Sequence, residues 1–210
     1  INLQGHTGLV NLIRLVEAEP PVVAQIGARQ VDEYIDKKER EKLANEINNL
    51  LTGAAKLWFD GIPLKIDELV KPIGRTKKTP VNVININGLD TFEDKCFVIS
   101  YVAFSIWRWM LPLGGTEEPR LLFYIDEIGG GGGRESYYPS YPYNPPTKPS
   151  LQRLLKEGRK YGVCCIFATQ NPKDFDVRGL SNCNTWMVSK LATDADRGRI
   201  KEGASNIDTN

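Results

Sequence analysis

The feature that most constrains the fold is a short apolar run that ends in two carboxylates. Residues 121–125 read LLFYI, and Asp126, Glu127 and a run of glycines follow closely. An apolar run this short, closed by residues that break regular structure, is typical of a strand buried on both faces in a parallel sheet. The two carboxylates are then expected at the carboxyl end of the strand, where open α/β sheets bind ligands. The alternative is a strand end that meets a solvated acidic turn.

A second apolar run predicts the neighbouring strand. Residues 163–168 read VCCIFA, follow a predicted helix over 150–162, and lead to Gln170. A strand, helix, strand unit of this kind is parallel and right-handed in nearly all known cases. Asp126, Glu127 and Gln170 are therefore expected at one edge of one sheet. Adjacent carboxylates there need a cation or a proton to balance their charge.

The remaining elements follow from hydrophobic periodicity. We expect helices at 8–17, 30–51 and 92–110, strands at 81–87 and 185–191, and a final helix from Asp194. Residues 129–149 are rich in Gly, Pro and Tyr, and no regular element suits that composition. We interpret them as a loose surface insertion rather than as a base-stacking surface, which is the alternative for tyrosines beside an arginine.

Composition excludes some classes of function. The net charge is +1 over 210 residues, so the overall charge does not indicate a polyanionic partner. The four cysteines show no CxxC spacing, which favours a reduced, cytoplasmic protein over a zinc or disulfide protein. The single histidine, His6, leaves no base for a histidine triad. We find no apolar run of about twenty residues, and therefore expect no membrane contact.

Four blocks of sequence resemble one known family. In order, these are LLFYIDEI, LLKEGRKYGV, CCIFATQNP and LSNCNTWMVSKLATDAD, preceded by WFDGIPLKIDELV and VNVININGLD. Together they resemble the C-terminal half of HerA-type ATPases, in the HerA/FtsK branch of RecA-like hexameric motors, over about residues 55–200. The resemblance implies an α/β fold, namely part of a RecA-like three-layer domain with a mainly parallel sheet, at 57–210. An N-terminal helical segment is expected at 1–56.

The family resemblance also implies roles for four residues. Asp126 is similar to the Walker B aspartate that positions Mg²⁺ through its water shell, and Glu127 to the catalytic glutamate that acts on the attacking water. Gln170 matches the polar residue that senses the γ-phosphate of ATP. Arg159 matches an arginine that reaches into the active site of the next subunit. The alternatives are a helix-dipole role for Arg159 and a turn-capping role for Gln170.

Two departures from the family pattern limit the resemblance. The family usually follows the acidic pair with Ala-His, whereas Ile128 and Gly129 follow here. The sequence also contains no GxxxxGK[ST] phosphate-binding loop. We therefore expect these residues alone to hydrolyse ATP very poorly.

Three explanations of the missing loop stay open. The chain belongs to a longer ATPase whose loop precedes Ile1, it is a degenerate relative kept for assembly, or it is an unrelated α/β binding domain. We favour the first, because all three acid and amide residues are present. The parent is then expected to be an ATP-driven DNA translocase or helicase that forms a hexameric ring. The alternative function is a catalytically inactive assembly or interaction module.

Overall fold

The computed structural model describes residues 5–18, 21, 25–53, 56, 59, 63–72 and 78–204. The chain divides into two compact units, Ile1–Pro63 and Leu64–Asn210. The sequence predicts its domain boundary between residues 56 and 57, a few residues before the division between the compact units. That domain boundary stays a prediction.

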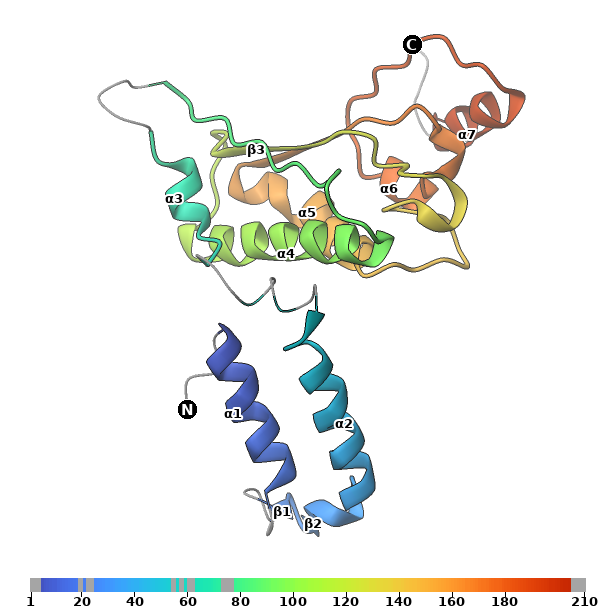
Figure 1. The fold of residues 1–210 in the computed structure, drawn as a ribbon. Coiled ribbons are helices and arrows are strands. Elements are labelled where there is room, and N and C mark those ends of the chain that lie inside the picture. Colours follow the sequence, from blue (N-terminus) through green and yellow to red (C-terminus); the bar gives the residue numbers. More distant parts are fainter. Residues whose placement is uncertain are drawn as a thin grey trace. The chain divides into compact units, whose positions relative to one another are not determined.

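The first unit is a pair of helices connected through a short β-hairpin (Figure 1). Its elements are α1 (Gly5–Glu17), the antiparallel strands β1 (Gln25–Ile26) and β2 (Arg29–Gln30), the 3-10 helix η1 (Val31–Glu33) and α2 (Lys37–Asn49). The Asp36 carboxylate accepts the Glu39 backbone N–H at 2.8 Å, and the Glu39 carboxylate accepts that of Asp36 at 3.3 Å. This capping box fixes the start of α2, so the helix is shorter than the predicted 30–51.

The second unit combines a two-stranded sheet with several helices (Figure 1). Its helices and strands are α3 (Ile66–Val70), α4 (Phe92–Met110), β3 (Leu121–Ile125), α5 (Thr147–Glu157), β4 (Val163–Phe167), α6 (Val177–Leu180) and α7 (Asp194–Ala204). Short 3-10 helices lie at Leu111–Leu113, Gly133–Glu135, Gly158–Tyr161 and Pro172–Asp174. The predicted helix over 92–110 is confirmed as α4, which Thr91 caps by accepting the Asp94 N–H at 3.0 Å.

Strands β3 and β4 pair in parallel. Leu121 lies opposite Val163, and Ile125 lies opposite Phe167. Helix α5 lies between the two strands in the chain, as the predicted strand, helix, strand unit requires. The prediction of a partial α/β domain with a parallel sheet and an N-terminal helical segment is therefore confirmed. The three-layer RecA-like arrangement stays an implication of the resemblance.

The core of this unit lies between one face of the sheet and two helices, α4 and α5 (Figure 1). Its buried members include Cys96, Ile99, Val102, Ala103, Ile106 and Met110 of α4, Leu151 and Leu154 of α5, and Ile125 and Val163 of the strands. On the other face, Leu122 is 61% exposed and Tyr124 is 52% exposed. The prediction of a strand buried on both faces is therefore wrong, because the helices that pack on the sheet cover the same face.

Neither of the two further predicted strands forms in the described residues. Residues 81–87 and 185–191 have no regular secondary structure. Val81 and Val83 are 83% and 86% exposed, and Met187 is 94% exposed. A strand depends on hydrogen bonds to a neighbouring strand, and neither segment pairs with a described strand. Both predictions are wrong for this reason.

The segment 129–149 is packed rather than loose. Tyr138 is fully buried and its ring stacks on Phe175 with 4.9 Å between centroids. The Lys148 ammonium forms an ion pair with the Asp176 carboxylate at 2.5 Å, and both side chains are nearly buried. The interpretation as a loose surface insertion is therefore wrong, because the tyrosine and the lysine anchor the segment to the chain that follows β4.

Helix α4 also bears on the membrane prediction. With the turn that follows it, the segment Phe92–Leu113 is long and apolar enough to cross a membrane, judged by length and composition alone. The prediction that no run of this length exists is therefore wrong. The same test is passed by core helices of globular domains, and six residues of α4 are buried in the core described above.

Candidate functional site

The carboxyl ends of β3 and β4 lie side by side. The Ala168 N–H donates to the Ile125 carbonyl at 3.0 Å, and the Ile128 N–H donates to the Ala168 carbonyl at 2.8 Å. These bonds continue the pairing beyond the last strand residues. The two carboxylates after β3 therefore leave the sheet beside the polar residues after β4. We call residues 126–129 and 168–171 the carboxyl edge.

Glu127 is the most tightly held side chain of the carboxyl edge. Its backbone has φ of +53°, in the left-handed region that non-glycine residues seldom adopt, and the side chain is half-buried. Its carboxylate Oε1 accepts the Thr169 hydroxyl at 3.1 Å. Both carboxylate oxygens also lie within 3.3–3.4 Å of the Gln170 backbone nitrogen, which donates to them. A strained backbone and three hydrogen-bond contacts thus fix one carboxylate at the sheet edge.

Asp126 differs from its neighbour because it is exposed. Its Oδ1 accepts the Tyr124 hydroxyl at 3.0 Å. This hydrogen bond to a carboxylate raises the pKa of Tyr124, because loss of the phenolic proton would place two negative groups in contact. Asp126 therefore keeps most of its oxygen surface open to solution, while one oxygen is oriented by the tyrosine.

Gln170 lies at the carboxyl edge as predicted, but its backbone makes the contact. Its N–H points at the Glu127 carboxylate, whereas its exposed side-chain amide forms no hydrogen bond with any described residue. The structure thus brings Asp126, Glu127 and Gln170 together. The roles of the three side chains in chemistry stay predictions.

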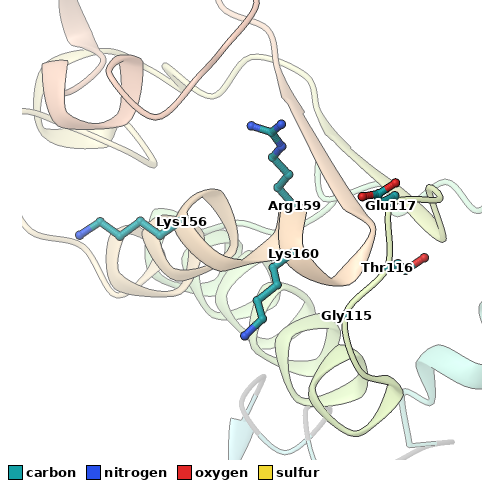
Figure 2. A pocket seen from close by; sticks show the side chains of 6 residues that line it. All are labelled: Gly115, Thr116, Glu117, Lys156, Arg159 and Lys160. Carbon is teal, nitrogen blue, oxygen red and sulfur yellow. The ribbon is translucent and has the colours of Figure 1, made fainter.

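Arg159 lies at the opposite edge of the sheet. It belongs to the short helix Gly158–Tyr161 that precedes β4, whereas the carboxylates follow β3. We call residues 114–120 and 158–162 the amino edge. A shallow depression here is lined by Gly115, Thr116, Glu117, Lys156, Arg159 and Lys160 (Figure 2). The Arg159 and Lys160 side chains point in opposite directions in Figure 2.

The separation of the two edges bears on the predicted role of Arg159. A five-residue strand is about 16 Å long, so Arg159 and the carboxylates of the same chain belong to different surfaces. The exposed guanidinium forms no hydrogen bond or ion pair with a described residue. An arginine that acts on the active site of a neighbouring subunit has to lie apart from its own carboxylates. The predicted role across a subunit boundary is compatible with this position and stays a prediction.

Two functional candidates were missed by sequence reasoning, namely Thr169 and Gly129. Thr169 lies between the predicted strand over 163–168 and Gln170, and a hydroxyl directly before a polar residue at a strand end is the signal that points to it. Gly129 lies within a glycine-rich run, and nothing in the sequence distinguishes it from its neighbours. A Cβ on Gly129 would lie 2.7 Å from Thr169 Oγ1 and 3.2 Å from Glu127 Oε1. Gly129 therefore provides the space in which threonine and glutamate meet.

The carboxyl edge suits a hydrated magnesium ion better than a fully protein-bound metal. Among the described residues, no group of three or more His, Cys, Asp or Glu side chains is arranged to hold a metal ion. Mg²⁺ commonly takes one or two protein carboxylates and fills its remaining positions with water and phosphate oxygens. An exposed Asp126 beside a fixed Glu127 fits that requirement.

Comparison with known proteins gives the family relationship. No family model matches the chain. Three proteins named "DNA double-strand break repair helicase HerA" align with most of it: the Sulfolobus acidocaldarius protein is 23% identical over 85% of the chain, that of Sulfurisphaera tokodaii 26% over 85%, and that of Saccharolobus solfataricus 26% over 82%. The chain is related to HerA. It spans about a third of the length of these HerA proteins, between 33% and 35%.

Proposed function

We propose that this chain is part of an ATP-hydrolysing motor of the HerA type, acting on DNA as a translocase or helicase. The single observation that carries the proposal is the carboxyl edge, where a fixed Glu127 lies beside an exposed Asp126. The relationship to HerA supports it, since the related proteins are named as DNA repair helicases.

In this proposal, Asp126 and Glu127 divide two tasks. Asp126 holds Mg²⁺ through its water shell, with Tyr124 orienting one of its carboxylate oxygens. Mg²⁺ held there would supply positive charge that offsets the negative charge of the phosphate groups. Glu127 orients a water molecule and accepts its proton at a carboxylate oxygen. Fixing the carboxylate in advance favours such a role, because no reorganisation is then needed during the reaction.

Gln170 and Arg159 complete the proposed site. The exposed Gln170 amide contacts the γ-phosphate and helps to align the attacking water. Arg159 comes from the neighbouring subunit, so each nucleotide lies between two subunits of a hexameric ring. A guanidinium there stabilises charge on the transferring phosphoryl group, an effect worth about a thousandfold or more in related systems. DNA is proposed to lie in the channel of the ring.

The sequence lacks one part that this chemistry needs. No GxxxxGK[ST] motif occurs in the 210 residues, so they supply neither its backbone cradle nor its lysine. The chain also spans only a third of the HerA proteins it resembles. We therefore propose that the phosphate-binding loop comes from outside these residues, and that these residues alone turn over little or no ATP.

Glu127→Gln in the full-length gene product tests the proposal. The variant keeps the shape of the side chain but removes its proton-accepting capacity. We expect ATP turnover to fall by about a hundredfold or more while binding of Mg-ATP is retained. Glu46→Gln makes the same change at an exposed position of α2 and is expected to have no effect. A full-length protein that binds Mg-ATP without turnover, or a Glu127→Gln variant with unchanged turnover, would refute the motor function.

The DNA part of the proposal needs a separate measurement. A motor that contacts DNA phosphates through lysine and arginine loses affinity as salt rises, with a slope set by the number of contacts. We expect the full-length protein to bind duplex DNA in fluorescence anisotropy, and to bind more weakly between about 50 and 200 mM salt. Absence of binding at the lowest salt would remove DNA from the proposal while leaving the ATPase intact.

A second candidate function is an inactive assembly or interaction module. It is favoured by the missing phosphate-binding loop and by the bare face of the sheet, where Leu122 and Tyr124 are exposed. This function predicts that Asp126→Ala and Glu127→Ala leave the behaviour of the full-length protein unchanged. The turnover and binding measurements above therefore separate the two candidates.

A further inference from the structure

We propose that Thr169 is a positioning residue that holds the Glu127 carboxylate in its working orientation. The importance of that orientation for ATP turnover rests on the proposed function. The positioning itself rests only on hydrogen bonds in the described residues. Thr169 is not among the residues that the family resemblance singled out.

The Thr169 hydroxyl is itself oriented by the backbone. The Asn171 N–H donates to Thr169 Oγ1 at 3.0 Å, in a local turn two residues long. A hydroxyl has one hydrogen to donate and two lone pairs that accept. Because the backbone N–H occupies a lone pair, the hydroxyl hydrogen stays available for Glu127 Oε1, at 3.1 Å. The turn thus aims the threonine at the glutamate.

Among the contacts to the Glu127 carboxylate, the one from Thr169 is the shortest. The other donor is the Gln170 N–H, whose nitrogen lies 3.3 Å from Oε1 and 3.4 Å from Oε2. Each contact is slightly longer than is typical for its kind, O–H···O for the threonine and N–H···O for Gln170. Among the described residues, loss of the threonine hydroxyl therefore leaves the carboxylate with the shared Gln170 N–H as its one donor, and the side chain gains rotational freedom.

Gly129 provides independent evidence for the importance of this contact. A Cβ at that position would lie 2.7 Å from the Thr169 hydroxyl oxygen, closer than real Cβ atoms approach. A side chain there would require the threonine hydroxyl to shift from its present position. The present arrangement of threonine and glutamate thus depends on glycine at position 129.

Two changes in the full-length gene product, Thr169→Val and Thr169→Ser, test the proposal. Valine keeps the size of threonine and removes the hydroxyl, whereas serine keeps the hydroxyl. We measure kcat and KM for ATP, and hydrogen–deuterium exchange of the Gln170 amide by fragmentation mass spectrometry. Loss of a hydrogen bond to a charged group predicts about a tenfold or greater fall in kcat for valine, with little change in KM. The Gln170 amide should exchange about tenfold faster or more, and serine should restore both values.

Thr116→Val is the matched control. Thr116 Oγ1 also accepts a backbone N–H two residues later, that of Glu118 at 3.0 Å, but at the amino edge of the sheet. The control therefore removes the same kind of turn without touching Glu127. We expect its Gln170 amide exchange to equal that of the unmodified protein, and kcat is not compared for this variant because Thr116 lines the same depression as Arg159. Thr169→Ala, which cannot overpack the site, replaces the valine variant if thermal unfolding shows that valine disrupts the fold.

The two readouts distinguish failure of the inference from failure of the proposed function. If the Thr169 variants without a hydroxyl leave both kcat and Gln170 amide exchange unchanged, Thr169 does not position Glu127. If these variants raise amide exchange, serine restores it, and no variant or unmodified protein turns over ATP, the positioning stands and the motor function fails. Failure of serine to restore the Gln170 amide exchange would also overturn the proposal, because the hydroxyl would then not be the group that acts.

Discussion

Backbone hydrogen bonds join the chain at both edges of the β3–β4 sheet, but only the carboxyl edge also holds a carboxylate. At the amino edge, the Arg120 N–H donates to the Gly162 carbonyl at 2.7 Å, and the Thr116 N–H donates to the Lys160 carbonyl at 3.0 Å. At the carboxyl edge, the Ile128 N–H donates to the Ala168 carbonyl at 2.8 Å, and the Thr169 hydroxyl in addition donates to the Glu127 carboxylate. Both edges fix the path of the chain, and the carboxyl edge also fixes a carboxylate.

The contrast extends to the two arginines of the amino edge. Arg120 donates through its guanidinium to the Gly114 carbonyl at 2.7 Å and to the Tyr161 carbonyl at 3.4 Å. Arg159 is exposed and donates to no described residue. The Arg120 guanidinium is thus bound within its own edge. Arg159 has no such contact with a described residue, so it is a better candidate than Arg120 for contact with another subunit.

The largest expected effect comes from removing that candidate, by Arg159→Ala in the full-length gene product. If each nucleotide lies between subunits, ATP turnover should fall about a thousandfold, because transition-state charge loses its guanidinium. Binding of Mg-ATP should change far less. Lys156→Ala, an exposed cation on the same depression, serves as the control and should retain turnover.

Mixing two inactive variants makes the test of Arg159 specific to an interface. Rings assembled from Arg159→Ala and Glu127→Gln subunits contain some interfaces at which an intact arginine meets an intact glutamate. Turnover should therefore reappear on mixing, as measured by phosphate release. A mixture that stays inactive, although mass spectrometry shows mixed oligomers, would contradict the role of Arg159 in a neighbouring site.

The next largest effect concerns the ion pair that anchors segment 129–149 to the chain after β4. Lys148→Met removes the ion-pair partner of the nearly buried Asp176 carboxylate, which then keeps the Arg178 N–H as its one donor among the described residues, so the free energy of unfolding should fall by about 3 kcal/mol. Lys71→Met is the control, because the Lys71 and Glu68 side chains are both 62% exposed and such pairs contribute about 0–1 kcal/mol. Urea denaturation followed by tyrosine and tryptophan fluorescence measures both. Equal effects would show that segment 129–149 is not anchored by this ion pair.

The sequence predicted the parts of this fold that local patterns determine. The apolar runs gave β3 and β4, and the connection through a helix predicted their parallel pairing. Because parallel strands end at the same edge, the meeting of Asp126, Glu127 and Gln170 followed. The place of Asp126 and Glu127 at this edge was thus predictable from the sequence, whereas their roles in chemistry stay predictions.

Other features depend on contacts that no local pattern records. The alternation in 81–87 favours a strand, but a strand needs a partner, and none pairs with it in the described residues. The composition of 129–149 suggested a loose segment, yet Tyr138 is buried against Phe175. The hydrogen bond from Thr169 to Glu127 joins residues 42 positions apart, so no local sequence pattern predicts it.

The smallest expected effect is found by substituting one glycine from each edge and comparing the two variants. Gly162 has φ of +75°, and a Cβ there would lie 2.5 Å from the Glu118 carbonyl oxygen, so the backbone itself has to move. Gly162→Ala should lower the free energy of unfolding by about 2 kcal/mol or more. At Gly129, the two tight contacts of a Cβ are with the ends of side chains, Thr169 Oγ1 and Glu127 Oε1, which can move, whereas the nearest backbone atom, the Asn171 carbonyl oxygen, lies 3.8 Å away. Gly129→Ala should therefore cost about 1 kcal/mol or less, measured by urea denaturation.

The same pair of variants should reverse its order in a measurement made at the carboxyl edge. Gly129→Ala displaces the Thr169 hydroxyl, so the Gln170 amide should exchange about tenfold faster although stability changes little. Gly162→Ala should leave that exchange unchanged in the folded protein, because the change lies at the amino edge. Amide exchange is compared rather than kcat, because Gly162 ends the 3-10 helix that carries Arg159. If Gly129→Ala turned out to be the more destabilising variant, or left Gln170 amide exchange intact, the division between a structural edge and a chemical edge would be wrong. The order of the two effects, rather than either value alone, decides the matter, because each variant serves as the control for the other.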